Sequence, residues 1–186
     1  MPKLVVFNHV SLDGYFVDGN GDMRWAHRED AEWSAFAAEN AGGGGRLLMG
    51  RVTYEMMASY WPTPHARENA PIVAERMNGL PKVVFSRTLA AATWANTKLV
   101  KTDVAGEVRK MKDEPGPNLV ILGSGTLVSQ LSDARLIDEY QIVVNSLALG
   151  SGRTLFGGLE KRLSLELKST RSFKNGNVVL SYGARA

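Results

Sequence analysis

The 186-residue chain contains no cysteine, and this absence removes several kinds of site at once. Disulfide bridges, thiolate zinc sites and a cysteine nucleophile are all excluded. The three histidines, His9, His27 and His65, are isolated and lack metal-ligand spacing, so we expect no metal site. No serine sits in a G-x-S-x-G turn, which argues against a hydrolase triad.

Long apolar runs are missing as well. No stretch approaches the roughly 18 apolar residues that span a bilayer. The amino-terminal segment MPKLVVFNHVSLDG turns polar at Asn8 and has no small-residue cleavage site, which is typical of a first strand and not of a signal peptide. We therefore expect a cytoplasmic protein with no membrane partner.

Charge of one sign is not concentrated anywhere. The formal net charge is +3, from 22 Lys and Arg against 19 Asp and Glu. The densest basic stretch, 161–174, spreads its five basic residues through an alternating strand pattern, as a solvated sheet face does. Nucleic-acid binders usually carry a dense Lys/Arg stripe, so no nucleic-acid partner is expected. A small anionic ligand fits this charge balance better.

Apolar runs alternate with helix-period segments through the first two thirds of the chain. Residues 12–25 carry several turn signals and predict a long loop, whereas 163–173 and 177–184 alternate around Asn175-Gly176 and predict a β-hairpin. The pattern predicts one α/β domain over 1–186, with a mostly parallel central sheet, flanking helices and a C-terminal antiparallel hairpin. The other expected strands are 3–12, 46–50, 81–86, 97–101, 119–122 and 137–147, and the expected helices are 28–41, 51–61, 67–78, 104–112 and 125–132.

The segment NLVILGSGTLVSQL (118–131) runs from a predicted strand through a glycine turn into a predicted helix. It fails as a dinucleotide fingerprint because Val128 replaces the third glycine and the motif lies late in the chain. Unpaired N–H groups and the helix dipole at such a helix start favour an anion. A tight turn with no ligand remains the alternative.

Two further strand ends carry polar or cationic residues. In MGRVTYE (49–55), Arg51 can pair with phosphate in bidentate fashion and Thr53 can cap the helix or bind phosphate oxygens. In FSRTL (85–89), Ser86 and Arg87 match the hydroxyl and guanidinium that NADP-selective sites place near the ribose. Since open α/β sheets bind ligands at the carboxyl ends of their strands, these ends predict a site for an elongated polyanion. On the helix 51–61 we expect Val52, Met56 and Met57 to pack into the core.

The ordered set SLDG, GDMRW, LLMGRVTYE, YW, KVVFSRTL, LVILGSGTLVSQL, LIDEYQI and LGSGRTLF resembles the dihydrofolate reductase-like fold. More specifically, the chain is similar to stand-alone relatives of the riboflavin-biosynthesis reductase (RibD C-terminal) domain. The resemblance implies a three-layer fold, NADPH as cofactor and a homodimer. It implies that Ser86 and Arg87 take the adenosine 2′-phosphate. Two loops would hold the pyrophosphate, one with Gly50, Arg51 and Thr53, the other with Gly123, Ser124, Gly125, Thr126 and Leu127.

The chain departs from the relatives in two respects. We expect no deaminase step, because the zinc deaminase of the bifunctional riboflavin enzyme needs cysteine ligands that this sequence lacks, and no segment of it reads as a deaminase domain. Folate reductases use one acid on the first helix, and Asp30 is the matching candidate, although an acid near a helix start is also favoured by the dipole. Candidate substrate contacts are His9, Trp25, Tyr60 and Trp61, since a planar ring can stack on such aromatic side chains. Ordinary core or rim packing is the alternative for each.

The resemblance therefore implies an NADPH-dependent reductase acting on a small, pyrimidine- or pterin-like heterocycle. The reaction would resemble that of 5-amino-6-(5-phosphoribosylamino)uracil reductase. Two alternatives stay open: a dihydrofolate reductase proper, and a non-catalytic nucleotide-binding dimer. The loop 12–25 would close over the nicotinamide, and Asp30 or a water that it holds would supply the proton.

Overall fold

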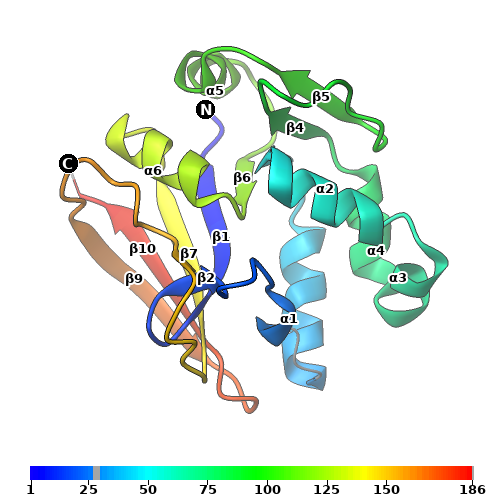
Figure 1. Ribbon diagram of the computed structural model, residues 1–186, viewed down its shortest axis with the longest axis vertical. Helices are drawn as coiled ribbons and strands as arrows, with labels where there is room; N and C mark the ends of the chain where they lie inside the picture. The colour runs from blue at the N-terminus through cyan, green and yellow to red at the C-terminus, as the bar shows by residue number, and fades with distance from the viewer. Residues whose placement is uncertain (27–29, 186) are drawn as a thin grey trace.

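The computed structural model describes residues 1–26 and 30–185 (Figure 1). Within these residues an eight-stranded sheet has the order β5-β4-β3-β6-β1-β7-β10-β9. From β5 to β7 neighbouring strands run parallel, whereas β10 runs antiparallel to both β7 and β9. The strands are β1 (Leu4–Ser11), β3 (Arg46–Gly50), β4 (Lys82–Phe85), β5 (Thr97–Val100), β6 (Leu119–Leu122), β7 (Glu139–Asn145), β9 (Leu165–Ser172) and β10 (Val178–Ala184).

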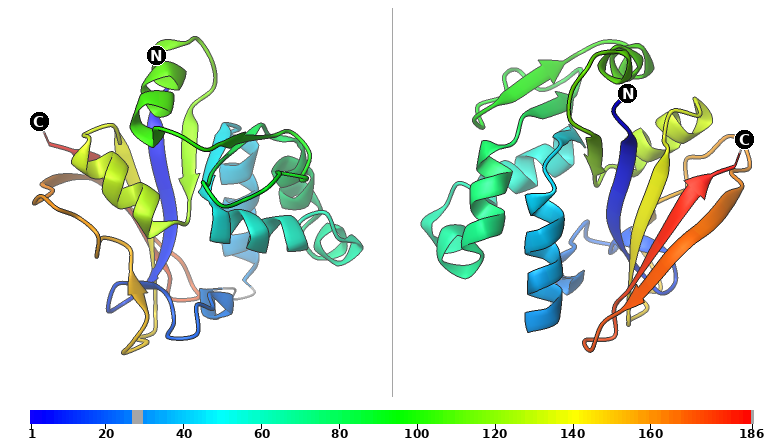
Figure 2. Two further views of the ribbon diagram at one scale, coloured as in Figure 1. Left: turned by 45° about the horizontal axis from the view of Figure 1, so that its top comes forward. Right: turned by 180° about the vertical axis from the view of Figure 1, so that it is seen from behind.

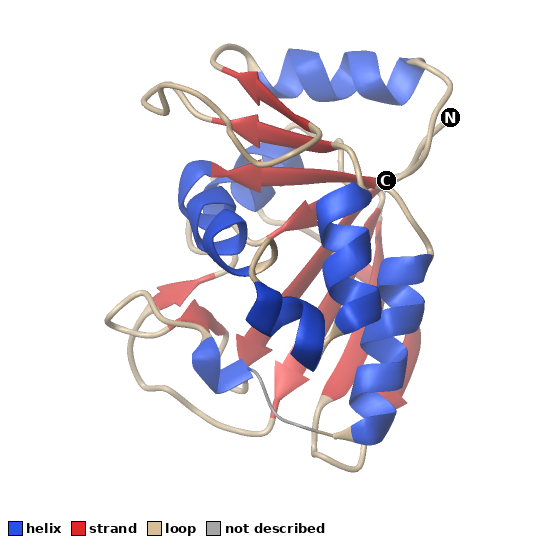
Figure 3. Cartoon of the chain, turned by 90° about the vertical axis from the view of Figure 1, so that its right-hand side faces the viewer, coloured by secondary structure: helices blue, strands red, loops and turns tan. Residues whose placement is uncertain are grey.

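Helices cover both faces of this sheet (Figure 3). On one face, α5 (Val104–Asp113) and α6 (Gly125–Asp133) pack on a core that includes Leu4 and Val6 of β1. On the other face, α1 (Ala31–Gly42), α2 (Arg51–Tyr60) and α4 (Pro71–Gly79) pack through clusters that include Trp33 and Tyr54. The predicted α/β fold, with its mostly parallel sheet and C-terminal hairpin, is confirmed. None of the described helices is long and apolar enough to cross a membrane.

The β9–β10 hairpin lies at the edge of the sheet opposite to β5 (Figure 2, right). Asn175-Gly176 forms its turn, with Gly176 at a φ of 88°. Because an antiparallel pair needs only a short turn, the hairpin could be predicted from local sequence alone.

Two predicted segments contain different elements from those expected, whereas most of the others differ by one or two residues at their ends. The single helix expected at 67–78 is two helices, α3 (Pro64–Asn69) and α4, with a break at Ala70. Pro71 disfavours helical geometry at the residue before it, and Ala70 has φ −145° and ψ 66°. The loop expected at 12–25 contains a short strand β2 (Tyr15–Val17), which pairs with β8 (Arg153–Thr154), and a 3₁₀ turn at Arg24–Ala26. The predicted start of helix 28–41 falls on residues outside the described part.

The prediction that Val52 and Met56 enter the core is wrong. Their exposed fractions are 54% and 39%, and both line a cleft, whereas Met57 packs partly into the core. Because β3 runs directly into α2, the rotation of the helix is set at this junction. That rotation directs Thr53 and Tyr54 inward instead.

Candidate functional site

Two strand–glycine–helix junctions, β3–α2 and β6–α6, interlock at the carboxyl edge of the sheet. An ideal Cβ built on Gly50 would lie 2.5 Å from Ser124 Oγ, and one built on Gly123 would lie 2.7 Å from Thr53 Oγ1. Gly123 and Ser124 both have a φ of 61°, which glycine adopts without strain and serine rarely adopts. Only glycine at positions 50 and 123 therefore lets these two loops approach so closely.

Both junctions present backbone donors. The N-cap of α2 is Gly50, which offers no side-chain acceptor. The N-cap of α6 is Ser124, whose Oγ accepts a long hydrogen bond of 3.4 Å from Leu127 N. The first N–H groups of a helix have no partner within the helix and carry the positive end of its dipole. Two such helix starts side by side suit an anion.

Cationic and hydroxyl side chains also follow the ends of β4 and β5, the two strands between β3 and the edge of the sheet. Ser86 Oγ accepts hydrogen bonds from Thr88 N (3.2 Å) and Leu89 N (2.9 Å), which turns the chain and leaves Arg87 exposed. Ser86 N donates to Val100 O at 3.0 Å, so the end of β5 lies beside it. Lys101 follows there, and it also lines the cleft. Sequence reasoning missed Lys101, although its place at the end of a predicted strand was a usable signal.

Arg51 is held only by a weak, exposed ion pair. Its Nη1 lies 2.9 Å from Glu55 Oε2, one turn further along α2. Both side chains are almost half exposed, at 45% and 47%. Exposed pairs of this kind contribute about 0–1 kcal/mol, so Arg51 can exchange this partner for a phosphate at little cost.

One cleft of about 2150 Å³ joins these features. It is lined by all ten predicted cofactor residues and by three of the four predicted substrate contacts. Trp25 and Asp30 are not among the described residues that line it. The predicted residues that do so are Gly50, Arg51, Thr53, Ser86, Arg87, Gly123, Ser124, Gly125, Thr126, Leu127, His9, Tyr60 and Trp61.

Asp30 has a structural role at the start of α1. Its Oδ1 accepts a hydrogen bond of 2.8 Å from Trp33 N, which makes it the N-cap of the helix. The α1 side chains that reach the cleft include Trp33 and Ala37. The catalytic role of Asp30 stays a prediction, and capping accounts for its position.

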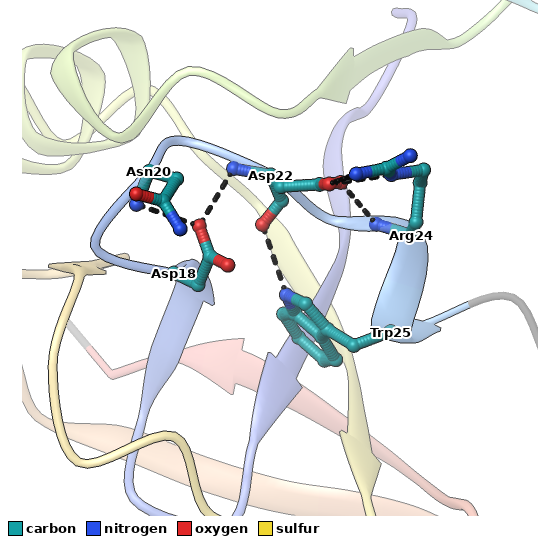
Figure 4. Close-up of polar contacts among 5 residues, drawn as sticks. All are labelled: Asp18, Asn20, Asp22, Arg24 and Trp25. Carbon is teal, nitrogen blue, oxygen red and sulfur yellow. Dashed lines mark hydrogen bonds and ion pairs between the residues drawn. The ribbon is translucent and has the colours of Figure 1, made fainter.

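Trp25 belongs to the network of the 18–25 loop (Figure 4). Asp18 Oδ1 accepts hydrogen bonds from Asn20 N (2.8 Å) and Asp22 N (2.9 Å), and Trp25 Nε1 donates to Asp22 O at 3.0 Å. Asp22 also pairs with Arg24, and this guanidinium holds the pKa of Asp22 below its usual value. These contacts hold residues 18–25 of the loop that we expect to close over the nicotinamide. The whole loop 12–25 forms a wall of the cleft through Phe16, Met23 and neighbouring residues.

A second anchor ties this loop to the segment after β7. Ser11 Oγ donates to Asp13 Oδ1 (2.6 Å), and Gly150 N donates to Asp13 Oδ2 (2.7 Å). With a further bond from Leu149 N, these donors lower the pKa of Asp13 from 3.8 to about 2. Asp13 therefore joins two loops at the rim of the sheet.

The predicted substrate contacts lie in two places. The ring centroids of His9, on β1, and Trp33 lie 5.3 Å apart in an edge-on arrangement. Nδ1 of His9 lies 3.3 Å from Asn145 Nδ2. Tyr60 and Trp61 lie at the end of α2 with their rings 5.0 Å apart. These aromatic groups can frame a planar ligand from two sides. In the described part of the chain, no group of three or more His, Asp or Glu side chains is placed to hold a metal.

Sequence reasoning also missed Asn8. It occupies the face of β1 that otherwise carries Leu4, Val6 and Val10, is 5% exposed and lines the cleft. Its Oδ1 accepts a hydrogen bond of 2.6 Å from Gly123 N. The available signal was a polar residue within an apolar strand, since such a residue requires a partner.

Comparison with known proteins identifies the family. The family model described as the RibD C-terminal domain matches residues 2–179. The chain belongs to this family. The uncharacterised protein YyaP of Bacillus subtilis (strain 168) is 25% identical over 181 residues, which cover 97% of this chain and 94% of YyaP.

Two solved structures of riboflavin-related proteins have a fold similar to that of this chain. A candidate riboflavin biosynthesis protein from Shewanella sp. PV-4 has a TM-score of 0.75 and 25% identity, and 99% of each chain is covered. The diaminohydroxyphosphoribosylaminopyrimidine deaminase/5-amino-6-(5-phosphoribosylamino)uracil reductase of Thermotoga maritima has a TM-score of 0.70 and 15% identity. That match covers 99% of this chain and 57% of the other, and it concerns the fold. The predicted resemblance to the RibD C-terminal family is confirmed.

Proposed function

We propose that this RibD C-terminal-family protein is an NADPH-dependent reductase of a small pyrimidine- or pterin-like heterocycle. The observation that carries the proposal is the single cleft in which two interlocked helix starts lie beside a row of cationic and hydroxyl side chains. Membership of the family and its reductase neighbours support the oxidoreductase class. When bound, NADPH would supply the hydride.

Strand order supports the direction in which the cofactor would lie. From the edge inward the strands are β5, β4, β3, β6 and β1. Lys101, Arg87, Arg51 and Gly123 follow the ends of the first four, and His9 lies within β1, two residues before its end. Neighbouring strands are about 4.8 Å apart, so the end of β4 and the end of β6 are separated by roughly 10 Å. That spacing suits a 2′-phosphate on Ser86 and Arg87 and a pyrophosphate between the two helix starts. The nicotinamide would then reach β1, where His9 lines the cleft.

The protein's own contribution would be binding, orientation and exclusion of water. The 12–25 loop would cover the nicotinamide, and the aromatic side chains of Trp33, Tyr60 and Trp61 would position the substrate ring. The family also favours a homodimer, which we include in the proposal and which sedimentation of the purified chain tests.

The first test is a titration of the intrinsic tryptophan fluorescence with NADPH and then NADH. We expect tighter binding of NADPH, and Arg87→Ala should weaken NADPH roughly tenfold while changing NADH little, since charge-assisted hydrogen bonds contribute about 1.5–3 kcal/mol. Arg67→Ala is the matched control, because Arg67 is exposed on α3 and is not among the described cleft residues. No binding of either cofactor by the wild type would refute the proposal.

A substrate panel then separates the alternatives. NADPH oxidation with pyrimidine substrates supports the proposed class. Turnover of dihydrofolate with methotrexate inhibition would make the protein a folate reductase. Cofactor binding without oxidation across pyrimidine, pterin and aldehyde substrates would indicate a non-catalytic nucleotide-binding protein.

A further inference from the structure

Asn8 is a buried polar side chain whose position needs a functional explanation. The neighbouring positions on its face of β1, Val6 and Val10, are 0% and 6% exposed and pack into the apolar core. An amide at this position costs free energy unless its polar atoms find partners. Asn8 is 5% exposed, so bulk water satisfies little of it.

The hydrogen bond to Gly123 fixes which way the amide faces. Gly123 N can only donate, so the atom 2.6 Å from it must be the carbonyl oxygen Oδ1. Nδ2, with its two N–H groups, therefore faces the other way. The structure records no partner for Nδ2 among residues 1–26 and 30–185. Among the described residues, Nδ2 of Asn8 is not one of the side-chain atoms that are fully buried without a hydrogen-bond partner. Asn8 lines the cleft, so the cleft is where Nδ2 can meet a ligand.

The surroundings indicate what Nδ2 would bind. Phosphate oxygens already have donors at the starts of α2 and α6 and at Arg51 and Arg87. Asn8 lies on β1, the strand next to β6, and is 5% exposed. Phe16, whose ring would lie 3.1 Å from a Cβ built on Gly125, also lines the cleft. An uncharged donor in mostly apolar surroundings matches an uncharged acceptor, because a buried charge would need a charged partner.

We propose that Asn8 Nδ2 donates a hydrogen bond to the carbonyl oxygen of a planar amide group on the ligand in this cleft. The same side chain holds the Gly123 turn through Oδ1, so ligand and loop share one anchor. The proposal rests on the proposed function. Two sources offer this carbonyl: the carboxamide of the nicotinamide and a ring lactam of the substrate.

The test follows the side-chain amide of Asn8 by ¹⁵N–¹H NMR, with its signals assigned by their loss in Asn8→Asp or, should that variant not fold, in Asn8→Ala. The probes are NADP⁺, then 2′-phospho-ADP-ribose, which keeps the pyrophosphate and the 2′-phosphate and lacks the nicotinamide. Uracil and pterin are finally added to the NADP⁺ complex. A shift with NADP⁺ but not with 2′-phospho-ADP-ribose identifies the carboxamide. A shift that appears only with uracil or pterin identifies the lactam.

Affinities provide an independent readout. Asn8→Asp keeps an acceptor for Gly123 and loses the donor, and its added negative charge disfavours phosphate equally in both ligands, so it should weaken the identified ligand about tenfold more than it weakens 2′-phospho-ADP-ribose. Asn175→Asp is the matched control, because Asn175 Oδ1 also accepts a backbone N–H, from Asn177, and Asn175 lies in the β9–β10 turn and is not among the described residues that line the cleft. Unshifted Asn8 signals at saturation, with equal affinity losses for the identified ligand and for 2′-phospho-ADP-ribose in the variant, would overturn the proposal. If wild-type protein binds neither NADP⁺ nor NADPH, the proposed function fails and this inference fails with it.

Discussion

The contact between Gly123 and Thr53 makes a sharp prediction about the interlocked loops. An alanine at position 123 would place Cβ 2.7 Å from Thr53 Oγ1 and 3.0 Å from Thr53 Cγ2, at a φ of 61°. The substitution therefore combines backbone strain with overpacking against a β-branched side chain. We expect Gly123→Ala both to destabilise the fold and to weaken NADPH, since the β6–α6 junction must move.

The magnitude follows from three contributions. Alanine in the left-handed region costs about 1–2 kcal/mol, and forcing extra atoms into a packed site costs about 1–3 kcal/mol. Replacing glycine by alanine also lowers the conformational entropy of the unfolded chain, which offsets about 0.4–1 kcal/mol of this loss. The net loss in the free energy of unfolding should be about 3 kcal/mol. Gly14→Ala is the matched control: Gly14 has a φ of 88° and nothing within 4 Å of an added Cβ, so it reports the backbone strain alone, about 1 kcal/mol.

Urea unfolding followed by tryptophan fluorescence measures the stability of each variant, and NADPH titration measures its binding. Thr53→Ala in the Gly123→Ala background should recover the overpacking part, giving a coupling of about 1–3 kcal/mol in the double-mutant cycle. Equal losses for Gly123→Ala and Gly14→Ala, or a second mutation that recovers nothing, would refute the proposed interlocking of the two loops.

Three further outcomes are expected. Lys82 Nζ donates to Met77 O, Asn78 O and Leu80 O, and burial lowers its pKa from 10.5 to about 8. The unfolded chain therefore binds more protons than the folded chain between pH 8 and 10.5. The free energy of unfolding of the wild type, minus that of Lys82→Met, should rise over that range, and a difference that stays constant would contradict the lowered pKa. The Asp13 pKa of about 2 predicts the acid counterpart: the stability advantage over Asp13→Asn should be full above pH 4 and shrink toward pH 2 in denaturation experiments. Asp30→Ala should cost about 0.5–2 kcal/mol of stability and Asp30→Ser much less, because serine also caps helices; a proton-donor role requires that both variants lose kcat, and wild-type kcat in Asp30→Ser would exclude it.

Most secondary structure was predictable because its signals are local. The strand Arg46–Gly50 was predicted with its observed bounds, and Gly123 and Gly176 mark the ends of elements through their positive φ angles. The break at Ala70 was missed, although Pro71 was a usable signal. The exposed position of Met56 could not be predicted from period alone, because the pattern of α2 does not say which side meets the sheet.

The candidate site was partly predictable for a related reason. Cofactor residues follow parallel strands, and the carboxyl ends of such strands share one edge of the sheet, so their meeting in one cleft could be expected. Asp30 and Trp25 do not line it, because a backbone N–H and a backbone carbonyl of their own segments engage their polar groups. Whether such a side chain bonds to its own segment or faces the cleft depends on the conformation of its loop, and no periodic pattern in the sequence reveals it.

Local composition was enough to establish the α/β class, the glycine junctions and the terminal hairpin, because each depends on residues close together in the chain. Tertiary structure alone decided that Gly50 meets Ser124, that Gly123 meets Thr53, and that Asn8 supports the turn from a neighbouring strand. These contacts join residues about 70 to 115 positions apart, and they depend on strand order and on the rotation of each helix. Packing of the whole sheet sets both, since no single segment can bury its apolar face by itself.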